Sequence, residues 1–346
     1  MRRMMLGRSG IEVSGWCLGT MTYGNQTPED DAHRQMDMAL DAGIDFIDTA
    51  EMYPVNPVRA ETAGRSEEFV GNWIAARGRR SDVVIATKIA GPGPILRPGT
   101  VPDGRQVKLC VEASLRRLRT DVIDLYQIHW PTRGTYCFRH NWTYDPSGQD
   151  RAATMAHMDD MLVALADCVA EGKIRAFGLS NETCWGTTRW IDRGEAVGGP
   201  RVATVQNEYS LLCRFWDTDA AEMAVNEDVT LLAFSPLAAG FLTGKYQHGA
   251  VPEGSRMALV PEMGGRKSER VFDAVSAYLR IAADHGLDPV HMAMAFTTAR
   301  PFPVCPIFGA TTVAQLERIL GGRDVVLSDE VLAAIGAAHK AHPMPY

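Results

Sequence analysis

The sequence lacks several features that would assign it to a common class of protein. No run approaches the ~18 consecutive apolar residues of a membrane-spanning helix, and no apolar signal segment begins the chain. The net charge of -7 gives no general attraction to nucleic acid or to an anionic membrane. Seven cysteines without CxxC or Cys/His metal spacing are typical of reduced thiols. We therefore expect a cytoplasmic protein that binds no nucleic acid, membrane or metal.

A linker is also missing, because no segment rich in Pro, Gly or Ser divides the 346 residues. The composition, 46% hydrophobic and 22% charged, is that of a globular protein with a large core. This length allows two domains, but α/β barrels commonly reach it as one. We predict a single domain over residues 1–346. Two arginine-rich segments, 77–80 and 116–119, end helical patterns and are interpreted as solvated helix ends.

Eight short apolar segments alternate with helical patterns along the chain, after two short runs (2–6 and 11–13) that flank a Gly-bounded turn. The apolar segments are 16–19, 44–48, 83–87, 122–128, 174–179, 202–205, 229–234 and 304–307. Helical patterns cover 28–41, 66–77, 104–119, 155–171, 183–193, 217–227, 312–320 and 328–340, with two more between 237 and 300.

The apolar segments are hydrophobic on both faces, as buried parallel strands are. Their alternation with helices favours a (β/α)8 TIM barrel with an N-terminal β-hairpin over an open doubly wound sheet. The phosphate-binding pattern G-x-G-x-x-G is absent after the first strand, which weakens the open-sheet alternative.

Three neighbouring strands of this predicted barrel end in residues that can carry chemistry. The strand at 44–48 ends at Asp48, with Tyr53 in the following loop, and the next two strands end at Lys88 and His129. Because the carboxyl ends of barrel strands share one rim, we expect these side chains to lie close together. Each alone has an ordinary explanation: an amine reaching solvent, a core histidine, a loop aromatic.

Together, these four residues can donate a proton to a carbonyl oxygen. A phenol has an ordinary pKa of about 10, which a nearby ammonium lowers by favouring the phenolate. A carboxylate can hold the ammonium in place, and an imidazole can orient the carbonyl and share the proton work. One His with one Asp is a poor set of metal ligands, so this chemistry is favoured over a metal site.

Proton donation to a carbonyl also requires a nucleophile such as a hydride. Later strand ends carry groups that can bind a carboxamide (Ser180, Asn181, Gln206) or stack on a flat ring (Phe234). Lys245 and Arg256, in the segment that follows, can hold phosphates. The turn at 309–311 precedes a helical pattern and can also hold a phosphate. These groups are the components of a nicotinamide dinucleotide site.

The chain resembles the aldo-keto reductase family, in particular its Tas-type bacterial members, which are related to potassium-channel β-subunits. The segments that carry the resemblance are 46–53, 85–88, 124–130, 178–181, 206–210, 235–237 and 242–246, within a similarity that extends from Leu18 to Thr312. The resemblance implies a catalytic tetrad of Asp48, Tyr53, Lys88 and His129, the cofactor NADP(H), and a small-molecule carbonyl substrate bound by Tyr53, His129 and Trp130.

The resemblance also implies where the cofactor lies. Its contacts would be Thr20, Asp48, Ser180, Asn181, Gln206, Phe234, Ser235, Pro236, Leu237, Ala238, Gly240, Lys245, Arg256, Gly309, Thr311 and Gln315, with Arg256 among the contacts to the 2'-phosphate and adenine. Related members carry Glu-Asn where this chain has Arg318-Ile319, and Arg318 can instead approach a phosphate. The loop at 131–150 should complete the substrate pocket through Arg133, Tyr136, Phe138, Arg139, His140 and Trp142.

Three functions follow from this reading. The first is an NADPH-dependent reductase of aldehydes and ketones, in which Tyr53 is the general acid, tuned by Lys88 and Asp48, and His129 orients the carbonyl. The second is a nucleotide-binding accessory or regulatory subunit with slow residual turnover, which an intact tetrad does not exclude. The third, a metal-dependent barrel hydrolase, predicts activity that chelators abolish.

Overall fold

Eight parallel strands close into a barrel in this computed structural model, which describes all 346 residues. The strands follow one another around the barrel in chain order, and the last pairs with the first. They are β3 (Cys17–Gly19), β4 (Phe46–Asp48), β5 (Val84–Ile89), β6 (Ile123–Ile128), β7 (Ile174–Ser180), β8 (Val202–Glu208), β9 (Thr230–Phe234) and β10 (Val304–Phe308). The predicted (β/α)8 barrel is confirmed.

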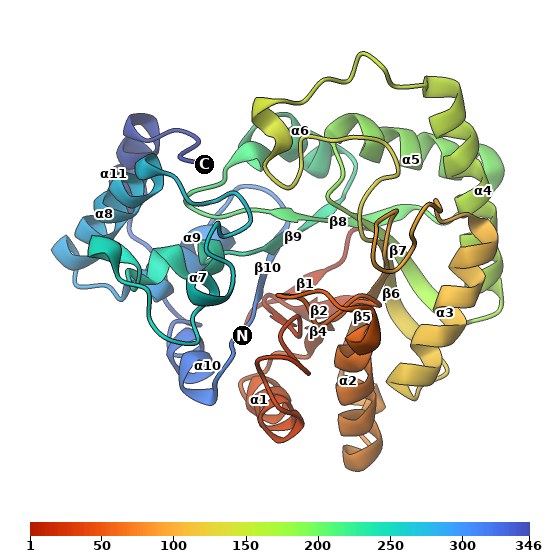
Figure 1. Cartoon of the computed structure of the whole chain (residues 1–346), viewed down its shortest axis with the longest axis horizontal. Coiled ribbons are helices and arrows are strands. Elements are labelled where there is room, and N and C mark those ends of the chain that lie inside the picture. Colours follow the sequence, from red (N-terminus) through yellow and green to blue (C-terminus); the bar gives the residue numbers. More distant parts are fainter.

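Helices surround the strands, with α2–α4 opposite α8–α11 (Figure 1). They are α1 (Glu29–Asp41), α2 (Arg65–Arg77), α3 (Gly104–Leu118), α4 (Arg151–Ala170), α5 (Cys184–Val197), α6 (Asp219–Asn226), α7 (Arg256–Leu259), α8 (Glu269–Asp284), α9 (Pro289–Thr298), α10 (Val313–Leu320) and α11 (Asp329–Ala341). None is long and apolar enough to cross a membrane.

The predicted N-terminal hairpin is present as β1 (Arg3–Met5) and β2 (Glu12–Ser14), which pair antiparallel. Its buried residues Leu6, Ile11 and Val13 pack in one cluster of 12 with inward-facing barrel residues such as Phe46 and Leu125. The hairpin therefore fills one end of the barrel with apolar side chains. The opposite end, where the strands finish, is left to the polar residues of the site.

Successive side chains of a barrel strand point to opposite faces, and both faces are buried here. On β6, Leu125 belongs to the cluster inside the barrel, whereas Tyr126 belongs to the cluster of 73 residues between the barrel and the helices. Gln127 follows on the inner face and is fully buried. This alternation decides which residues near a strand end reach the interior.

Several boundaries differ from those that the sequence predicts. Strand β5 continues past Lys88 to Ile89, and β8 continues past Gln206 to Glu208. Parallel pairing places Lys88 opposite Gln127 and Gln206 opposite Ser180, so these side chains are held by strand register. Helix α4 begins four residues early because Asp150 caps it by accepting a hydrogen bond from the Ala153 N–H.

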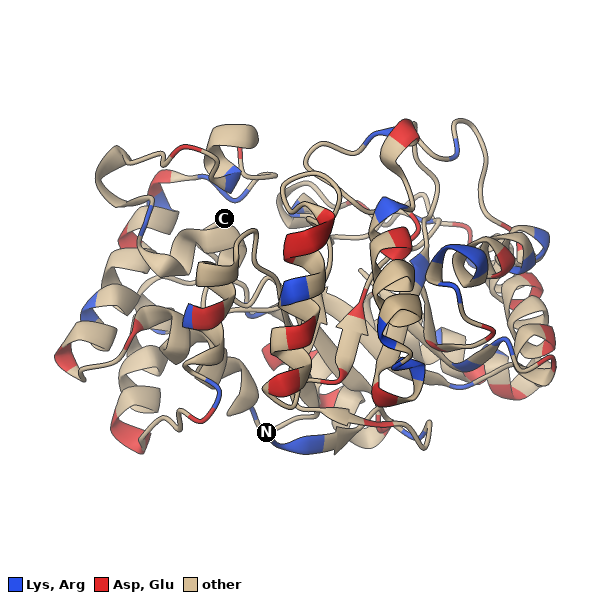
Figure 2. Cartoon of the chain, turned by 90° about the horizontal axis from the view of Figure 1, so that it is seen from below, with Lys and Arg blue, Asp and Glu red and all other residues tan.

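The arginine-rich segments are not simply solvated. Arg80 pairs with the buried Asp124 at 2.7 Å, and Arg117 pairs with the buried Glu67 at 2.6 Å. A buried carboxylate needs such a partner, which the helical pattern alone did not reveal. Elsewhere, acidic and basic residues are interspersed over the helices (Figure 2). All seven cysteines are free, as expected.

Candidate active site

A cavity of about 690 Å³ opens at the carboxyl ends of the barrel strands. Most of the residues predicted for the site line it: Asp48, Tyr53, His129, Trp130, Ser180, Asn181, Gln206, Phe234, Ser235, Pro236, Leu237, Gly240, Lys245, Arg256, Gly309, Thr311 and Gln315. Three residues of the predicted tetrad and cofactor contacts do not. Lys88, Thr20 and Ala238 are fully buried, and the Thr20 hydroxyl donates to the Asp48 carbonyl oxygen at 3.0 Å.

A buried ion pair lies beneath the cavity. The Lys88 ammonium donates to Asp48 Oδ2 at 2.6 Å and to the Thr49 carbonyl oxygen at 2.7 Å. The two charged side chains are 0% and 2% exposed. Burial lowers the pKa of Lys88, but the Asp48 carboxylate and Tyr53 outweigh it, so that pKa is raised overall. Lys88 is therefore a fixed cation, and its alternative explanation as an amine reaching solvent is wrong.

The phenol of Tyr53 lies beside this cation, which is 4.8 Å from the centroid of the Tyr53 ring. Burial raises the pKa of Tyr53, Lys88 lowers it and Asp48 raises it, with a net increase above the ordinary value of about 10. Lys88 lowers the pKa of Tyr53, as expected from the sequence, but burial raises that pKa by more. The phenol consequently keeps its proton at neutral pH.

The imidazole of His129 contacts the same phenol, with ring centroids 5.6 Å apart. Burial and, secondarily, the charge of Lys88 hold the pKa of His129 well below its ordinary value of about 6.5. Its Nδ1 is buried without a hydrogen-bond partner. His129 is thus a neutral imidazole at neutral pH, and it can donate one hydrogen bond without carrying a charge.

Two glutamine amides complete the surroundings of Asp48. Gln206 Nε2 donates to Asp48 Oδ1 at 2.8 Å, and Gln127 Nε2 donates to the same oxygen at 3.2 Å. Gln127 was not predicted as a site residue. It lies within the strand, two positions before His129, and the apolar pattern of that strand does not show that its side chain faces inward. Only the register of β6 against β5 places it beside Lys88 and Asp48.

The next two strand ends supply more amide and hydroxyl groups. Asn181 Nδ2 donates to the His129 carbonyl oxygen at 2.9 Å and to Ser180 Oγ at 3.1 Å. Ser180 Oγ in turn donates to the Gln206 carbonyl oxygen at 2.8 Å. Asn181 has a positive φ of 52°, which Asn tolerates better than most residues. The strand ends are therefore joined to one another by hydrogen bonds on the floor of the cavity.

The far end of the cavity has a different character, because two of its cations have no partners. Lys245 and Arg256 both line the cavity and form no ion pair, although Lys245 Nζ lies 5.2 Å from the centroid of the Tyr246 ring. Burial and the charge of Arg266 lower the pKa of Arg256. Two unpaired cations at the edge of a cavity favour an anionic ligand such as a phosphate.

Comparison with known proteins decides the family to which this chain belongs. The model of the aldo/keto reductase family matches residues 16–340. Protein tas of Escherichia coli (strain K12) is 44% identical over 344 residues, which cover 97% of this chain and 97% of that protein. The chain belongs to the aldo/keto reductase family.

Two further relatives of this aldo/keto reductase also match it over nearly its full length. The uncharacterized oxidoreductase YrpG of Bacillus subtilis (strain 168) is 32% identical, over 94% of this chain and 92% of that protein. A probable voltage-gated potassium channel subunit beta of Arabidopsis thaliana is 31% identical, over 93% and 90%. Membership supports a reductase function, and members of the family generally use nicotinamide cofactors.

A third cation, which the resemblance implies can approach a phosphate, lies at the far end of the cavity. Arg318, which lines the cavity, forms a two-point ion pair with Asp288, at 2.9 Å (Nε to Oδ2) and 3.1 Å (Nη2 to Oδ1). Its guanidinium is therefore already neutralised, in contrast with Arg256. The neighbouring Ile319 adds an apolar side chain to the same wall.

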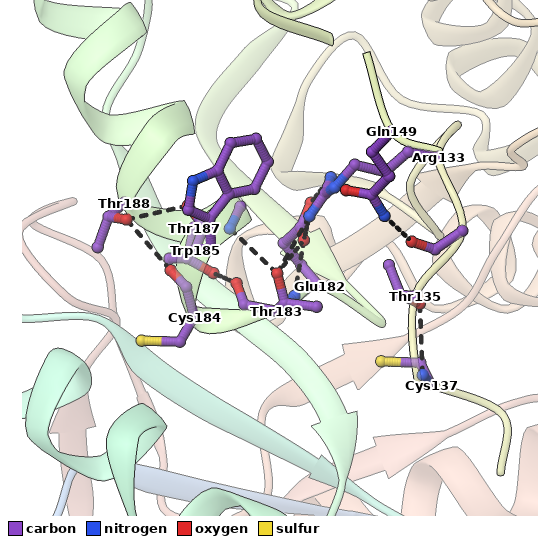
Figure 3. Close-up of polar contacts among 12 residues, drawn as sticks. Arg133, Thr135, Cys137, Gln149, Glu182, Thr183, Cys184, Trp185, Thr187 and Thr188 are labelled. Atoms are coloured by element: carbon purple, nitrogen blue, oxygen red, sulfur yellow. Dashed lines mark hydrogen bonds and ion pairs between the residues drawn. The ribbon is translucent and has the colours of Figure 1, made fainter. Parts of the chain in front are cut away.

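The loop at 131–150 contributes less to the cavity of this reductase than the sequence predicts. Only Phe138 of the loop lines it, next to Trp130. Tyr136 and Arg139 line a separate small pocket of about 40 Å³. Arg133 turns away and pairs with the buried Glu182, as Figure 3 shows, with Nη1 and Oε2 3.0 Å apart. The prediction that Arg133, Tyr136, Arg139, His140 and Trp142 line this cavity is wrong.

Several apolar residues of the cavity were missed by sequence reasoning. Met21, Met52, Val55 and Val58 lie in the loops that follow β3 and β4, and they form a wall near Tyr53. No motif marks them, because irregular loops carry no periodic pattern. Their position is fixed partly by the hydrogen bond from the Val55 N–H to the Met21 carbonyl oxygen at 3.2 Å.

Proposed function

We propose that this aldo/keto reductase uses NADPH to reduce aldehydes and ketones to alcohols, and that residues 1–346 act as one domain. The observation that carries the proposal is the Tyr53 phenol, which lines a 690 Å³ cavity beside the buried Lys88–Asp48 pair. A structural role explains an ion pair on a barrel floor. It does not explain why a phenol and a neutral imidazole meet above that pair.

The chain's own groups fit a nicotinamide dinucleotide phosphate. Lys245 and Arg256 would hold its phosphates, and Ser180, Asn181 and Gln206 would bind its carboxamide, with Phe234 against the ring. The bound cofactor supplies the hydride that reduces the carbonyl carbon. We favour NADP(H) over NAD(H) because Arg256 has no carboxylate partner and is therefore available to the additional 2'-phosphate.

In the proposed mechanism, Tyr53 gives its proton to the carbonyl oxygen. The adjacent Lys88 ammonium stabilises the phenolate that remains, and Asp48 holds that ammonium in place. His129 stays neutral and donates a hydrogen bond that orients the carbonyl. General acid catalysis of this kind contributes about 10²–10⁴-fold to the rate.

The substrate end of the cavity supports neutral, apolar carbonyl compounds. Met52, Val55, Val58, Trp130 and Phe138 line the region around Tyr53 and His129. The nearby arginines of the loop are unavailable, since Arg133 pairs with Glu182 and Arg139 with Glu208. We expect benzaldehyde to be reduced ~10-fold or more efficiently (kcat/KM) than 4-carboxybenzaldehyde, whose charge would be buried without a partner.

The alternative is an accessory subunit that binds the nucleotide and turns over slowly, favoured by the similarity to a probable channel β-subunit. One experiment separates the two functions: tryptophan fluorescence is titrated with NADPH and NADH, and NADPH oxidation is then followed with a panel of aldehydes. A reductase binds NADPH more tightly than NADH, and aldehydes accelerate its turnover. Tight binding with no acceleration by any aldehyde would favour the accessory role.

A further inference from the structure

Gln127 is fully buried on the inner face of β6, and the proposed mechanism gives it no part. Its side chain nevertheless contacts two residues of the site. Nε2 donates to Asp48 Oδ1 at 3.2 Å, and Oε1 accepts from Gln206 Nε2 at 3.2 Å. Gln206 Nε2 also donates to Asp48 Oδ1 at 2.8 Å. The three side chains thus form a closed ring of hydrogen bonds.

The ring fixes which way the amide of Gln206 faces. A carboxylate can only accept hydrogen bonds, so Asp48 requires the amino group of Gln206 on its side. Gln127 Oε1 accepts the second hydrogen of that amino group. Both donors of Gln206 are then used, and its Oε1, which has no partner within the protein, is the only polar atom that Gln206 has left for a ligand in the cavity.

The amide of Asn181 is also held with its amino group towards the protein. Its amino group donates both hydrogens, to the His129 carbonyl oxygen and to Ser180 Oγ, which leaves Asn181 Oδ1 as an acceptor. Gln206 and Asn181 both line the cavity, so they offer it two amide oxygens and no free amide donor. A ligand group with two N–H donors, such as a primary carboxamide, matches this arrangement, whereas a methyl ketone of the same shape does not.

We propose that Gln127 is a positioning residue, which holds the amide of Gln206 with its oxygen towards the cavity and so makes the site select a carboxamide amino group. The inference rests on the proposed nicotinamide function. Asp48 anchors one hydrogen of the Gln206 amino group, and Gln127 anchors the other. Without Gln127 the amide can pivot about its remaining bond, and its oxygen is no longer held where the carboxamide needs it.

The test compares NADPH with its reduced 3-acetylpyridine analogue, in which a methyl group replaces the carboxamide amino group. The readout is the ratio of the two dissociation constants, measured by quenching of tryptophan fluorescence. Gln127→Met keeps the length of the side chain and removes both hydrogen-bonding groups. We expect it to reduce the preference for NADPH by about 2- to 12-fold, the range of one neutral hydrogen bond.

One further variant and one control test the cause. Gln127→Asn withdraws the acceptor by one methylene, so its ratio should fall; it serves if Gln127→Met does not fold. Tyr126→Phe is the control on the same strand, because the Tyr126 hydroxyl is buried without a hydrogen-bond partner, and it should leave the ratio unchanged.

An unchanged ratio in Gln127→Met or Gln127→Asn would overturn the inference. So would an equal fall in Tyr126→Phe, since that result would indicate a general loosening of the barrel floor. The proposed function fails separately, when the wild-type protein binds NADPH no better than NADH or does not bind it at all. A wild type that binds NADPH with no preference over the analogue would overturn the Gln127 inference alone.

Discussion

The two ends of the cavity differ in how their charges are arranged. At the barrel floor, Lys88 is paired with Asp48, and the amides of Gln127 and Gln206 satisfy the remaining carboxylate oxygen. At the outer end, Lys245 and Arg256 have no carboxylate partner. The floor is built from strands and satisfies its own charges. The outer end is built largely from loops and leaves positive charge available to a ligand.

This difference assigns each end a task. A buried charge without a partner costs several kcal/mol, so the floor can retain Lys88 beside Tyr53 only because Asp48 is there. Lys245 and Arg256 at the outer end are only partly buried, so leaving them without a partner costs less than it would at the floor. The paired end is suited to proton transfer at fixed positions, and the unpaired end to attraction of a phosphate.

The largest effect is expected from a substitution that removes the acid at the floor and leaves the outer end of the cavity intact. Tyr53→Phe should lower kcat for aldehyde reduction by about 10²–10⁴-fold, because the general acid is lost. The dissociation constant for NADPH should stay within about threefold of wild type, since neither Lys245 nor Arg256 is disturbed. Steady-state kinetics and fluorescence titration provide the two values. Equal kcat in the variant and the wild type would remove Tyr53 from its role.

The second prediction breaks the pairing at the floor. Lys88→Met leaves Asp48 buried without its cation and should lower the free energy of unfolding by about 3–5 kcal/mol. The double variant Asp48→Asn/Lys88→Met removes both charges and should recover most of that loss. Unfolding in urea measures all three. If the single variant is as stable as wild type, the charges at the floor are less tightly coupled than the 2.6 Å contact indicates.

The third prediction tests the unpaired cations. Arg256→Ala should weaken NADPH binding by about 1.5–3 kcal/mol, the contribution of a charge-assisted hydrogen bond, and should affect NADH much less. Lys245→Met should weaken both cofactors alike, because they share the pyrophosphate that we assign to Lys245. The four dissociation constants give the comparison. An equal loss for both cofactors in Arg256→Ala would move Arg256 away from the 2'-phosphate.

The smallest effect is expected at the one outer cation that already has a partner. Arg318 is 46% exposed and neutralised by Asp288, and exposed ion pairs contribute about 0–1 kcal/mol. Arg318→Gln should therefore change the affinities for NADPH and NADH by less than about fivefold, and by the same factor. A selective loss of NADPH affinity in this variant would assign the 2'-phosphate to Arg318 in place of Arg256.

The sequence predicted the floor better than the outer wall, for physical reasons. Buried strands carry a clear apolar pattern, so Asp48, Lys88 and His129 could be placed at strand ends before any contact was known. Gln127 could not, because its role depends on the register of β6 against β5. Arg133 and Arg318 could not either, since only the fold brings each beside its carboxylate.

The loops were the least predictable part of the site. Met21, Met52, Val55 and Val58 come from irregular segments, and their approach to Tyr53 depends on backbone contacts rather than on a periodic pattern. The boundaries of strands were also approximate, since β5 and β8 each extend beyond their predicted ends. Asp48, His129, Ser180 and Gln206 nevertheless lie at or near the carboxyl ends of their strands and line one cavity, because a parallel barrel gathers these ends on one rim.

The measurement that tests the central claim most directly is the pH profile of kcat in both directions. Because the pKa of Tyr53 is raised above about 10, reduction, which needs the phenol, should be constant through neutral pH and fall only as pH rises through that pKa. Oxidation of the alcohol needs the phenolate and should rise with pH. The lowered pKa of His129 leaves no titration near pH 6.5.

Lys88→Met supplies the decisive arm of the same experiment. Burial raises the pKa of Tyr53 and Lys88 lowers it, so removing the ammonium should raise that pKa further. The alcohol-oxidation profile should then move to higher pH, while reduction falls in rate but survives at neutral pH. An oxidation profile that stays at its wild-type position in Lys88→Met would contradict the claim that Lys88 tunes the proton of Tyr53.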